Sequence, residues 1–363
     1  MENEIDEFLL ELLRSRSPTG TEREAADVVE KYVGSAAAGG VKRDVLGNRY
    51  AMYGDGEKVL MLSGHMDEIG FIVSYIDDDG FLFFEQLGGH DNVMLPGRRV
   101  AVITKAGYVY GVTGKRAVHL MDAKERKEVP ETFQVWIDIG ATSRAEAEKL
   151  VRIGDPVVYD TAVRKLSTTR YSARAFDDRA GCYCVFEALR RLWRDNAKTD
   201  YRVVSVATTQ EEIGTRGAIT AAYALNPKVG LAVDVDHATD FPTCDKRKFG
   251  SIKLGGGPVI SRGPNINPKV FDRLVECAEK EGVPYQISAE SRPTGTDARV
   301  IQMARGGVAT GLLGVPLRYM HTPSEVADLG DIEGCVRLIV AFAKSLKKVF
   351  VNKKNPALDS IAL

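Results

Sequence analysis

A β-rich stretch of about ninety residues interrupts an otherwise regular alternation of helices and strands. From about Ile69 to Asp160, short apolar runs such as Phe71–Ile76 and Val100–Ile103 are separated by turn signals, and only one clear helix intervenes. On both sides of this stretch, helical and strand patterns alternate, which is typical of a largely parallel sheet covered on both faces. The β-rich segment is therefore expected to be a small barrel or sandwich inserted into one α/β domain.

We predict an α/β fold with a mostly parallel central sheet flanked by helices and an inserted small β-barrel domain. Residues 1–67 and 167–363 would form the α/β domain and residues 68–166 the insert. The 363 residues are enough for one large domain and one smaller one. Helices are expected at 5–13, 21–32, 178–196, 217–225, 267–281, 296–305 and 333–348, and strands at 59–63, 203–208, 229–235 and 308–313. Thr21 and Glu24 predict a capping box for the second helix.

The composition excludes several classes of partner. Forty-nine basic and 50 acidic residues give a net charge of −1, so no overall field exists to bind nucleic acid or an anionic membrane. No stretch reaches the roughly 18 apolar residues of a membrane span. The odd number of cysteines, 5, and an N-terminus without a signal-peptide pattern indicate reduced thiols in a cytoplasmic protein.

Polar clusters follow the predicted strands at the points where those strands end. They are His65–Glu68, Asp177–Arg179, Gln210–Gly214 and Asp234–Asp236, and a fifth, Tyr319–Pro323, follows the last strand. In an open α/β sheet the carboxyl ends of the strands face the crevice where ligands bind. Clusters far apart in the sequence are therefore expected to meet in one site.

Two histidines and several carboxylates form a mixed nitrogen and oxygen ligand set that suits Zn, Co or Mn, and it lacks the thiolates of structural zinc sites. Two neighbouring ions need one bridging carboxylate and, for each ion, one His and one further carboxylate, which makes five ligands. A Glu that is not a ligand would take the proton from water. In the His-x-Asp pattern, the carboxylate of Asp67 would accept the second ring N–H of His65 and fix its tautomer.

The sequence around these clusters resembles the cocatalytic di-metal aminopeptidases of the TET, or glutamyl-aminopeptidase, family. The motifs occur in one order over nearly the whole chain, and five in register are far more specific than any one alone. They are His65–Gly70, Phe176–Arg179, Gln210–Gly214, Ala232–Val235 and Arg318–Pro323, with Gly263–Pro268 and Gly295–Ala298 between them.

The resemblance implies that the α/β domain is zinc-aminopeptidase-like, and it implies a role for each matching residue. Asp177 would bridge two divalent ions, Zn or Co, and Glu211 would be the general base. One ion would be completed by His65 and Asp234, and the other by Glu212 and His321. The β-rich insert would be a dimerisation domain, and the dimers would assemble into a hollow homododecamer that takes short peptides rather than folded proteins.

Each signal also has a structural interpretation. Glu211 and Glu212 are a possible solvated helix start, and Asp177 and Asp178 can cap the following helix, a role that Asp178 is expected to take. The family pattern has an aromatic residue where this chain has His90, which puts the contacts of that segment in doubt.

The three remaining histidines are isolated in the sequence. His90, His119 and His237 are expected to be structural, with His237 close enough to Asp234 to lie behind it. The basic run Lys246–Lys248 is expected to be a solvated loop.

The sequence thus predicts a metal-dependent aminopeptidase that hydrolyses N-terminal residues from short peptides. A deacylase of small N-acyl compounds is an alternative, because the same two ions can hydrolyse other amides. A non-catalytic peptide-binding shell is an alternative from another class. A glycosidase fits least, because two histidines beside the carboxylates have no role in ordinary glycosidase chemistry. The side-chain preference is left open.

Overall fold

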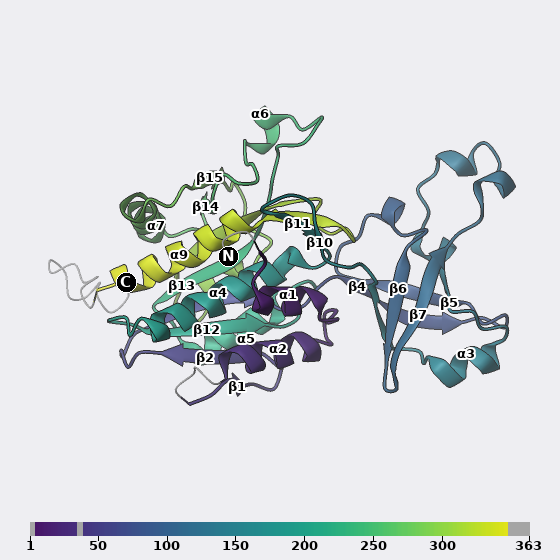
Figure 1. Cartoon of the computed structure of the whole chain (residues 1–363), viewed down its shortest axis with the longest axis horizontal. Coiled ribbons are helices and arrows are strands. Elements are labelled where there is room, and N and C mark those ends of the chain that lie inside the picture. The colour runs from purple at the N-terminus through teal and green to yellow at the C-terminus, as the bar shows by residue number, and fades with distance from the viewer. Residues whose placement is uncertain (1–3, 35–38, 348–363) are drawn as a thin grey trace.

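The computed structural model describes residues 4–34 and 39–347 of the chain. The described part consists of an α/β body and a separate β-barrel that projects from one side of it (Figure 1). Each has its own hydrophobic core of buried side chains. None of the described helices combines the length and apolar character that a membrane crossing requires.

The α/β body is built on one mixed sheet, in which eleven strands belong to the described residues. The strand order is β1-β2-β12-β3-β13-β16-β17-β11-β10, with β14 beside β16 and β15 beside β14. Their bounds are β1 Lys42–Arg43, β2 Arg49–Tyr53, β3 Val59–His65, β10 Arg164–Lys165, β11 Arg170–Ala173, β12 Arg202–Thr208, β13 Val229–His237, β14 Val259–Arg262, β15 Gln286–Ala289, β16 Ala309–Arg318 and β17 Glu325–Asp328.

The centre of this sheet is parallel, as the alternation of helices and strands predicts. Strands β12, β3, β13 and β16 run in the same direction, with Thr208 opposite His65 and Asp234 opposite Gly314. The outer pairs, such as β1 with β2 and β17 with β11, are antiparallel. The carboxyl ends of the four central strands therefore share one edge, where the polar residues that follow them can meet.

Helices cover both faces of the sheet. One face carries α4, with α1, α2 and α9 packed against it and α7 against α9, and the other face carries α5 and α8. α4 is the central helix because fifteen of its residues are buried. The bounds are α1 Glu7–Arg14, α2 Arg23–Val33, α4 Phe176–Arg194, α5 Arg216–Leu225, α6 Lys246–Phe249, α7 Pro268–Glu281, α8 Ala298–Gln302 and α9 Leu329–Ser345.

The β-rich stretch forms a closed antiparallel barrel of six strands in the order β4-β5-β8-β7-β6-β9. Alternate apolar side chains, among them Phe71, Phe84 and Val100, fill its interior. The bounds are β4 Gly70–Ile76, β5 Leu82–Leu87, β6 Arg99–Thr104, β7 Gly107–Gly114, β8 Trp136–Asp138 and β9 Pro156–Tyr159, with α3 at Arg144–Leu150 and short 3₁₀ helices at Asn92–Met94, Val118–Leu120, Glu125–Lys127 and Thr132–Gln134. The barrel of the predicted fold is confirmed, and the exact division at 68 and 166 and the dimerisation role stay predictions.

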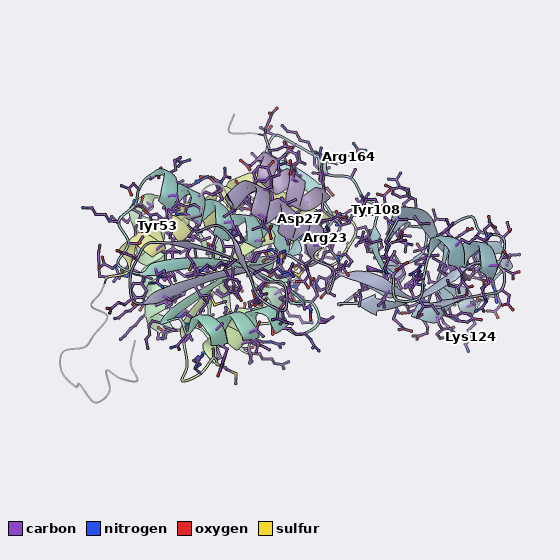
Figure 2. The ribbon with its side chains drawn as sticks, turned by 90° about the horizontal axis from the view of Figure 1, so that it is seen from below. Arg23, Asp27, Tyr53, Tyr108, Lys124 and Arg164 are labelled. Carbon is purple, nitrogen blue, oxygen red and sulfur yellow. The ribbon has the colours of Figure 1, made fainter. Side chains whose placement is uncertain are left out.

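Polar and aromatic contacts join the barrel to the α/β body. The Arg16 guanidinium lies 4.4 Å from the centre of the Tyr108 ring and pairs with Asp160 at 2.9 Å. The Tyr108 hydroxyl donates a hydrogen bond to Glu24 of α2. Tyr108 accordingly lies on the side of the barrel that faces α2, whereas Lys124 lies at its far end (Figure 2).

Some local predictions are wrong. The capping box does not form, because α2 begins after Glu22 and Glu24 accepts instead from the backbone N–H of Arg16. The helix predicted at 296–305 is shorter, at Ala298–Gln302, and the strand after it extends to Arg318. The predicted end of the last helix, Lys348, lies outside the described residues.

Candidate active site

The candidate site lies at the carboxyl edge of the central strands. His65 is the last residue of β3, and Asp234 lies near the end of β13. Glu211 and Glu212 follow β12, and His321 follows β16. Together with Asp177 at the start of α4, these side chains line one pocket of about 420 Å³. The structure therefore brings together the residues that the five sequence clusters contribute.

The carboxylate of Asp177 lies between the two imidazoles. Its Oδ1 is 3.2 Å from Nε2 of His65, and its Oδ2 is 3.2 Å from Nε2 of His321. Glu212 approaches the same ring of His321, with Oε2 3.5 Å from Nε2. Glu211 approaches the other histidine, with its Oε2 3.9 Å from Nε2 of His65. One carboxylate thus offers each of its oxygens to a different histidine.

Asp67 lies behind this group and is fully buried. Its two carboxylate oxygens accept the backbone N–H groups of Glu211 and Glu212 at 3.1 and 3.2 Å. Nδ1 of His65 lies 3.2 Å from the carbonyl oxygen of Asp67 and 3.5 Å from its Oδ1. Asp67 therefore positions the glutamate pair as well as the His65 ring, a double role that the His-x-Asp pattern does not predict.

Asp178 acts as a buried support. Its carboxylate accepts the backbone N–H of His65 at 3.0 Å and that of Gly181 at 2.9 Å. The bond to Gly181 lies in the first turn of α4, which is the helix-start role that the sequence predicts. The bond to His65 ties the end of β3 to α4, and the peptide bond between Asp177 and Asp178 is cis.

Glu325, at the start of β17, is a residue that the sequence did not single out. Its carboxylate accepts the backbone N–H of Asp177 at 3.1 Å and that of His321 at 3.0 Å. It therefore fixes two residues of the site from a third segment. His321 and Tyr319 have φ values of 61° and 62°, so their backbones lie in the left-handed region that non-glycine residues rarely adopt.

The buried carboxylates repel one another. Burial and the negative charges of Asp234, Asp297 and Glu212 raise the pKa of Glu211 to about 10, although His65 opposes the shift. Burial and Asp177 raise the pKa of Glu212 well above its ordinary value, and burial raises that of Asp234 to about 7. These groups cannot all be charged at neutral pH unless positive charge is added between them.

The two histidines supply part of that positive charge in the protein itself. Burial lowers the pKa of His65, but hydrogen bonds to Asp177 and Asp67 outweigh this effect and the pKa is raised. The pKa of His321 is raised in the same way by Asp177. Burial raises the pKa of Asp177, but its hydrogen bonds to both histidines lower it below the ordinary value.

The chemistry of these donors fits divalent cations. Ligand atoms of His65, Asp178 and Asp234 lie within 4.8 Å of one another, and so do those of His65, Asp177 and Glu212. Neutral imidazole and carboxylate oxygen suit Zn and neighbouring transition metals. The residues present can therefore hold metal ions without a change of fold.

The other three histidines have different surroundings. His90 stacks on Phe71 of the barrel core, with ring centroids 4.5 Å apart, and lies edge-on to Tyr159 at 6.0 Å. It thus provides a flat ring where the family pattern has an aromatic residue. His119 is exposed on a 3₁₀ helix, whereas His237 lines the pocket at the end of β13.

Comparisons with known proteins agree on one family. The M42 glutamyl aminopeptidase family matches residues 47–338. The lysyl aminopeptidase of Pyrococcus furiosus is 40% identical over 309 residues, which are 85% of this chain and 87% of that protein.

Solved structures show the same fold. A TET aminopeptidase from a marine sediment archaeon of the Thaumarchaeota has a TM-score of 0.90 and 34% identity, covering 94% of this chain and 96% of that one. The TET1 peptidase of Pyrococcus horikoshii, which can assemble into a tetrahedron or a large octahedral shell, has a TM-score of 0.84 and 32% identity over 94% of this chain and 99% of that one. The chain therefore belongs to the M42 glutamyl aminopeptidase family.

Proposed function

We propose that this chain is a metal-dependent aminopeptidase that removes N-terminal residues from short peptides, with two divalent ions per subunit. The observation that carries the proposal is the position of Asp177, whose two oxygens each lie 3.2 Å from a different histidine. A carboxylate that serves two separate imidazoles has the geometry that a bridging ligand needs. Membership of an aminopeptidase family supports the same conclusion.

In this proposal Asp177 would bridge the two ions. His65 and Asp234 would complete one site, and Glu212 and His321 would complete the other, for which the 3.5 Å approach of Glu212 to His321 is support. Asp178 is left out because its oxygens already accept two backbone N–H groups. Zn or Co is the expected metal, since both accept mixed imidazole and carboxylate ligands.

Bound divalent ions supply polarisation of a carbonyl group and a lowered pKa of water. Glu211 is the proposed general base, because it lines the pocket without being needed as a ligand. A carboxylate at this position can accept the proton of the attacking water and pass it to the leaving amine. Asp67 is proposed to position Glu211 and Glu212 through their backbone N–H groups.

We further propose that the barrel is a dimerisation domain and that dimers assemble into a homododecamer in the cytoplasm. The support is the fold shared with the TET1 peptidase of Pyrococcus horikoshii, because a tetrahedron with a dimer on each edge has twelve subunits. A hollow assembly would restrict access to short peptides.

The test is the metal-dependent hydrolysis of aminoacyl anilides in free-amine and N-acetylated forms. The protein is assayed after chelation and again after Zn or Co is added back. Hydrolysis confined to free amines and restored by metal supports the aminopeptidase. Faster hydrolysis of the acetylated series would instead identify a deacylase, and binding of peptides without hydrolysis in either series would identify a binding shell.

A further inference from the structure

A second cavity, of about 460 Å³, lies between the α/β body and the barrel and is lined by none of the candidate site residues. The end of α1, the first residue of β6 and the segment that joins β9 to β10 contribute to its wall. Arg164, the first residue of β10, lies where the chain returns from the barrel to the body (Figure 2). The proposed mechanism uses no part of this cavity.

Arginine side chains dominate the wall of the cavity. We call them the arginine cluster, and they are Arg14, Arg16, Arg99, Arg164 and Arg174. Among the described residues that line the cavity, one is acidic, Asp160, and none is a lysine. A guanidinium group is planar and always charged, and it can bind phosphate or carboxylate through two parallel hydrogen bonds. The residues of the wall therefore favour an anion.

The protein itself pairs two of these five charges. Arg16 pairs with Asp160 at 2.9 Å, and the buried Arg174 donates to Glu68. Glu68 also accepts from the buried Arg179 at 3.1 Å, so one carboxylate serves two guanidinium groups. Positive charge therefore exceeds negative charge even among the paired groups.

Arg14, Arg99 and Arg164 lack such partners. In the part of the chain that the structure describes, none of their guanidinium groups forms an ion pair or a hydrogen bond. The Glu24 carboxylate of α2 accepts instead from a backbone N–H and from the Tyr108 hydroxyl. A cleft lined by charges of one sign concentrates ions of the opposite sign. The cluster is thus open to an external anion.

Arg16 supplies an independent observation. Its guanidinium is held between Asp160 and the Tyr108 ring, whose centre lies 4.4 Å away. Its Nε–H is nevertheless buried and has no hydrogen-bond acceptor among the described residues. Buried donors are normally paired, so this one indicates an acceptor from outside the chain. An anion with several oxygens in the cavity would supply it.

We propose that the arginine cluster binds an anion that carries phosphate groups. A phosphate group presents several acceptor oxygens with a charge of about −2 at neutral pH, which matches several guanidinium groups better than one carboxylate does. The volume of the cavity lies in the range of small-molecule sites, so pyrophosphate or a nucleotide fits. Because the cluster joins α1, β6 and β10, the bound anion would link the barrel to the α/β body. This inference is independent of the proposed aminopeptidase function.

Inorganic pyrophosphate is the probe, and calorimetry measures its binding. The wild-type protein is compared with the double variant Arg14→Gln and Arg99→Gln, whose replaced side chains are exposed and outside the core. Hydrogen bonds to charged groups predict that this variant binds at least about tenfold more weakly. The titrations use metal-loaded protein and are repeated after chelation, when the candidate metal site no longer contributes. Equal affinities in the two proteins would overturn the proposal.

A matched control separates the cluster from the net charge. Arg152→Gln with Arg247→Gln removes the same charge from two exposed positions that do not line the cavity. This control should bind pyrophosphate as the wild-type protein does. A decrease as large as that of the cluster variant would show that only net charge matters, and it would overturn the proposal.

Competing anions identify the chemical class and its source. Orthophosphate and ATP should both displace pyrophosphate, whereas citrate, whose charges are all carboxylates, should bind more weakly. Tighter binding of ATP than of pyrophosphate would support the site and identify a nucleotide as its ligand, and equal binding would support recognition of the phosphate groups alone. Citrate that binds as tightly as pyrophosphate would overturn the assignment to phosphate.

Discussion

Glu211 is the side chain whose replacement should separate chemistry from metal binding. Glu211→Gln keeps the shape and the backbone N–H bond to Asp67 but removes the base. Loss of a general base predicts a decrease of kcat by about 10²–10⁴-fold. Elemental analysis should still find two ions per chain. The control is Glu333→Gln on the exposed side of α9, and a wild-type rate in Glu211→Gln would exclude the assignment.

His321 tests the ligand assignment. Replacement by alanine removes a ring that lies 3.2 Å from Asp177 and 3.5 Å from Glu212. His321→Ala should therefore lose one of the two ions after dialysis, as measured by elemental analysis, while His119→Ala on the exposed 3₁₀ helix keeps both. Two retained ions in His321→Ala would count against its role as a ligand.

His90 should make the folded protein sensitive to acid. Burial lowers its pKa to about 4 from the ordinary 6.5, so the unfolded chain takes up this proton first as the pH falls. The stability that the neutral, buried His90 ring contributes to the folded protein is complete above pH 6.5 and is lost between pH 6.5 and 4.

The variant His90→Phe has no such proton. Between pH 7 and 4.5 its free energy of unfolding should fall by about 2 kcal/mol less than that of the wild-type protein. Urea unfolding at the two pH values measures the difference. Parallel decreases in the two proteins would show that His90 does not titrate in this way.

At the residue scale, the sequence predicts the candidate ligands because each one ends or follows an apolar strand. His65, Asp234 and Glu212 share this pattern, and parallel pairing brings strand ends together. Glu325 carries no such signal, because it acts through backbone N–H groups of distant segments.

At the scale of elements, α4 is fixed to its surroundings by a buried charge. Arg179 is fully buried, and its guanidinium donates to Glu68 at 3.1 Å and to the carbonyl of Leu12 in α1 at 2.8 Å. Arg174 donates to the other oxygen of Glu68. This network joins α1, the end of β3 and α4, and so it supports the segment that carries Asp177.

Arg179→Leu should therefore destabilise the fold strongly. Removing one partner leaves Glu68 buried with less compensation, which predicts a decrease of about 3–5 kcal/mol in the free energy of unfolding. Arg190→Leu on the same helix breaks a more exposed pair with Glu187 and should cost about 1 kcal/mol or less. Urea unfolding of both variants checks the prediction, and similar losses in the two would contradict it.

Long periodic elements are predictable from the sequence, and short ones are not. The spacing of buried residues predicts α1, α7 and the four central strands. The antiparallel strands β10 and β17 have two and four residues, too few to show a period. The capping box fails because Glu24 bonds to Arg16 and Tyr108, and the contact with Tyr108 depends on the barrel.

At the scale of the whole molecule, the barrel projects from the α/β body and exposes much of its surface (Figure 1). Large apolar side chains on it, including Leu120 and Phe133, are 74% and 71% exposed. Such side chains fit an interface between copies of the chain. Light scattering should give a mass twelve times the 39.7 kDa of the chain, and a monomer at micromolar concentration would contradict the proposed assembly.

The insertion itself is predictable from the sequence, because the pattern changes abruptly from alternating helices and strands to short β-rich runs, and this β-rich stretch is long. Its partners in an assembly are not predictable in this way, since an interface depends on surface shape that one sequence does not encode in a periodic pattern.

Anomalous X-ray diffraction from crystals loaded with Zn or Co tests the proposed bridging role of Asp177. Two anomalous peaks are expected, one on each side of the Asp177 carboxylate. One peak should lie beside His65 and Asp234 and the other beside Glu212 and His321. A single peak, or peaks away from Asp177, would contradict the bridging role.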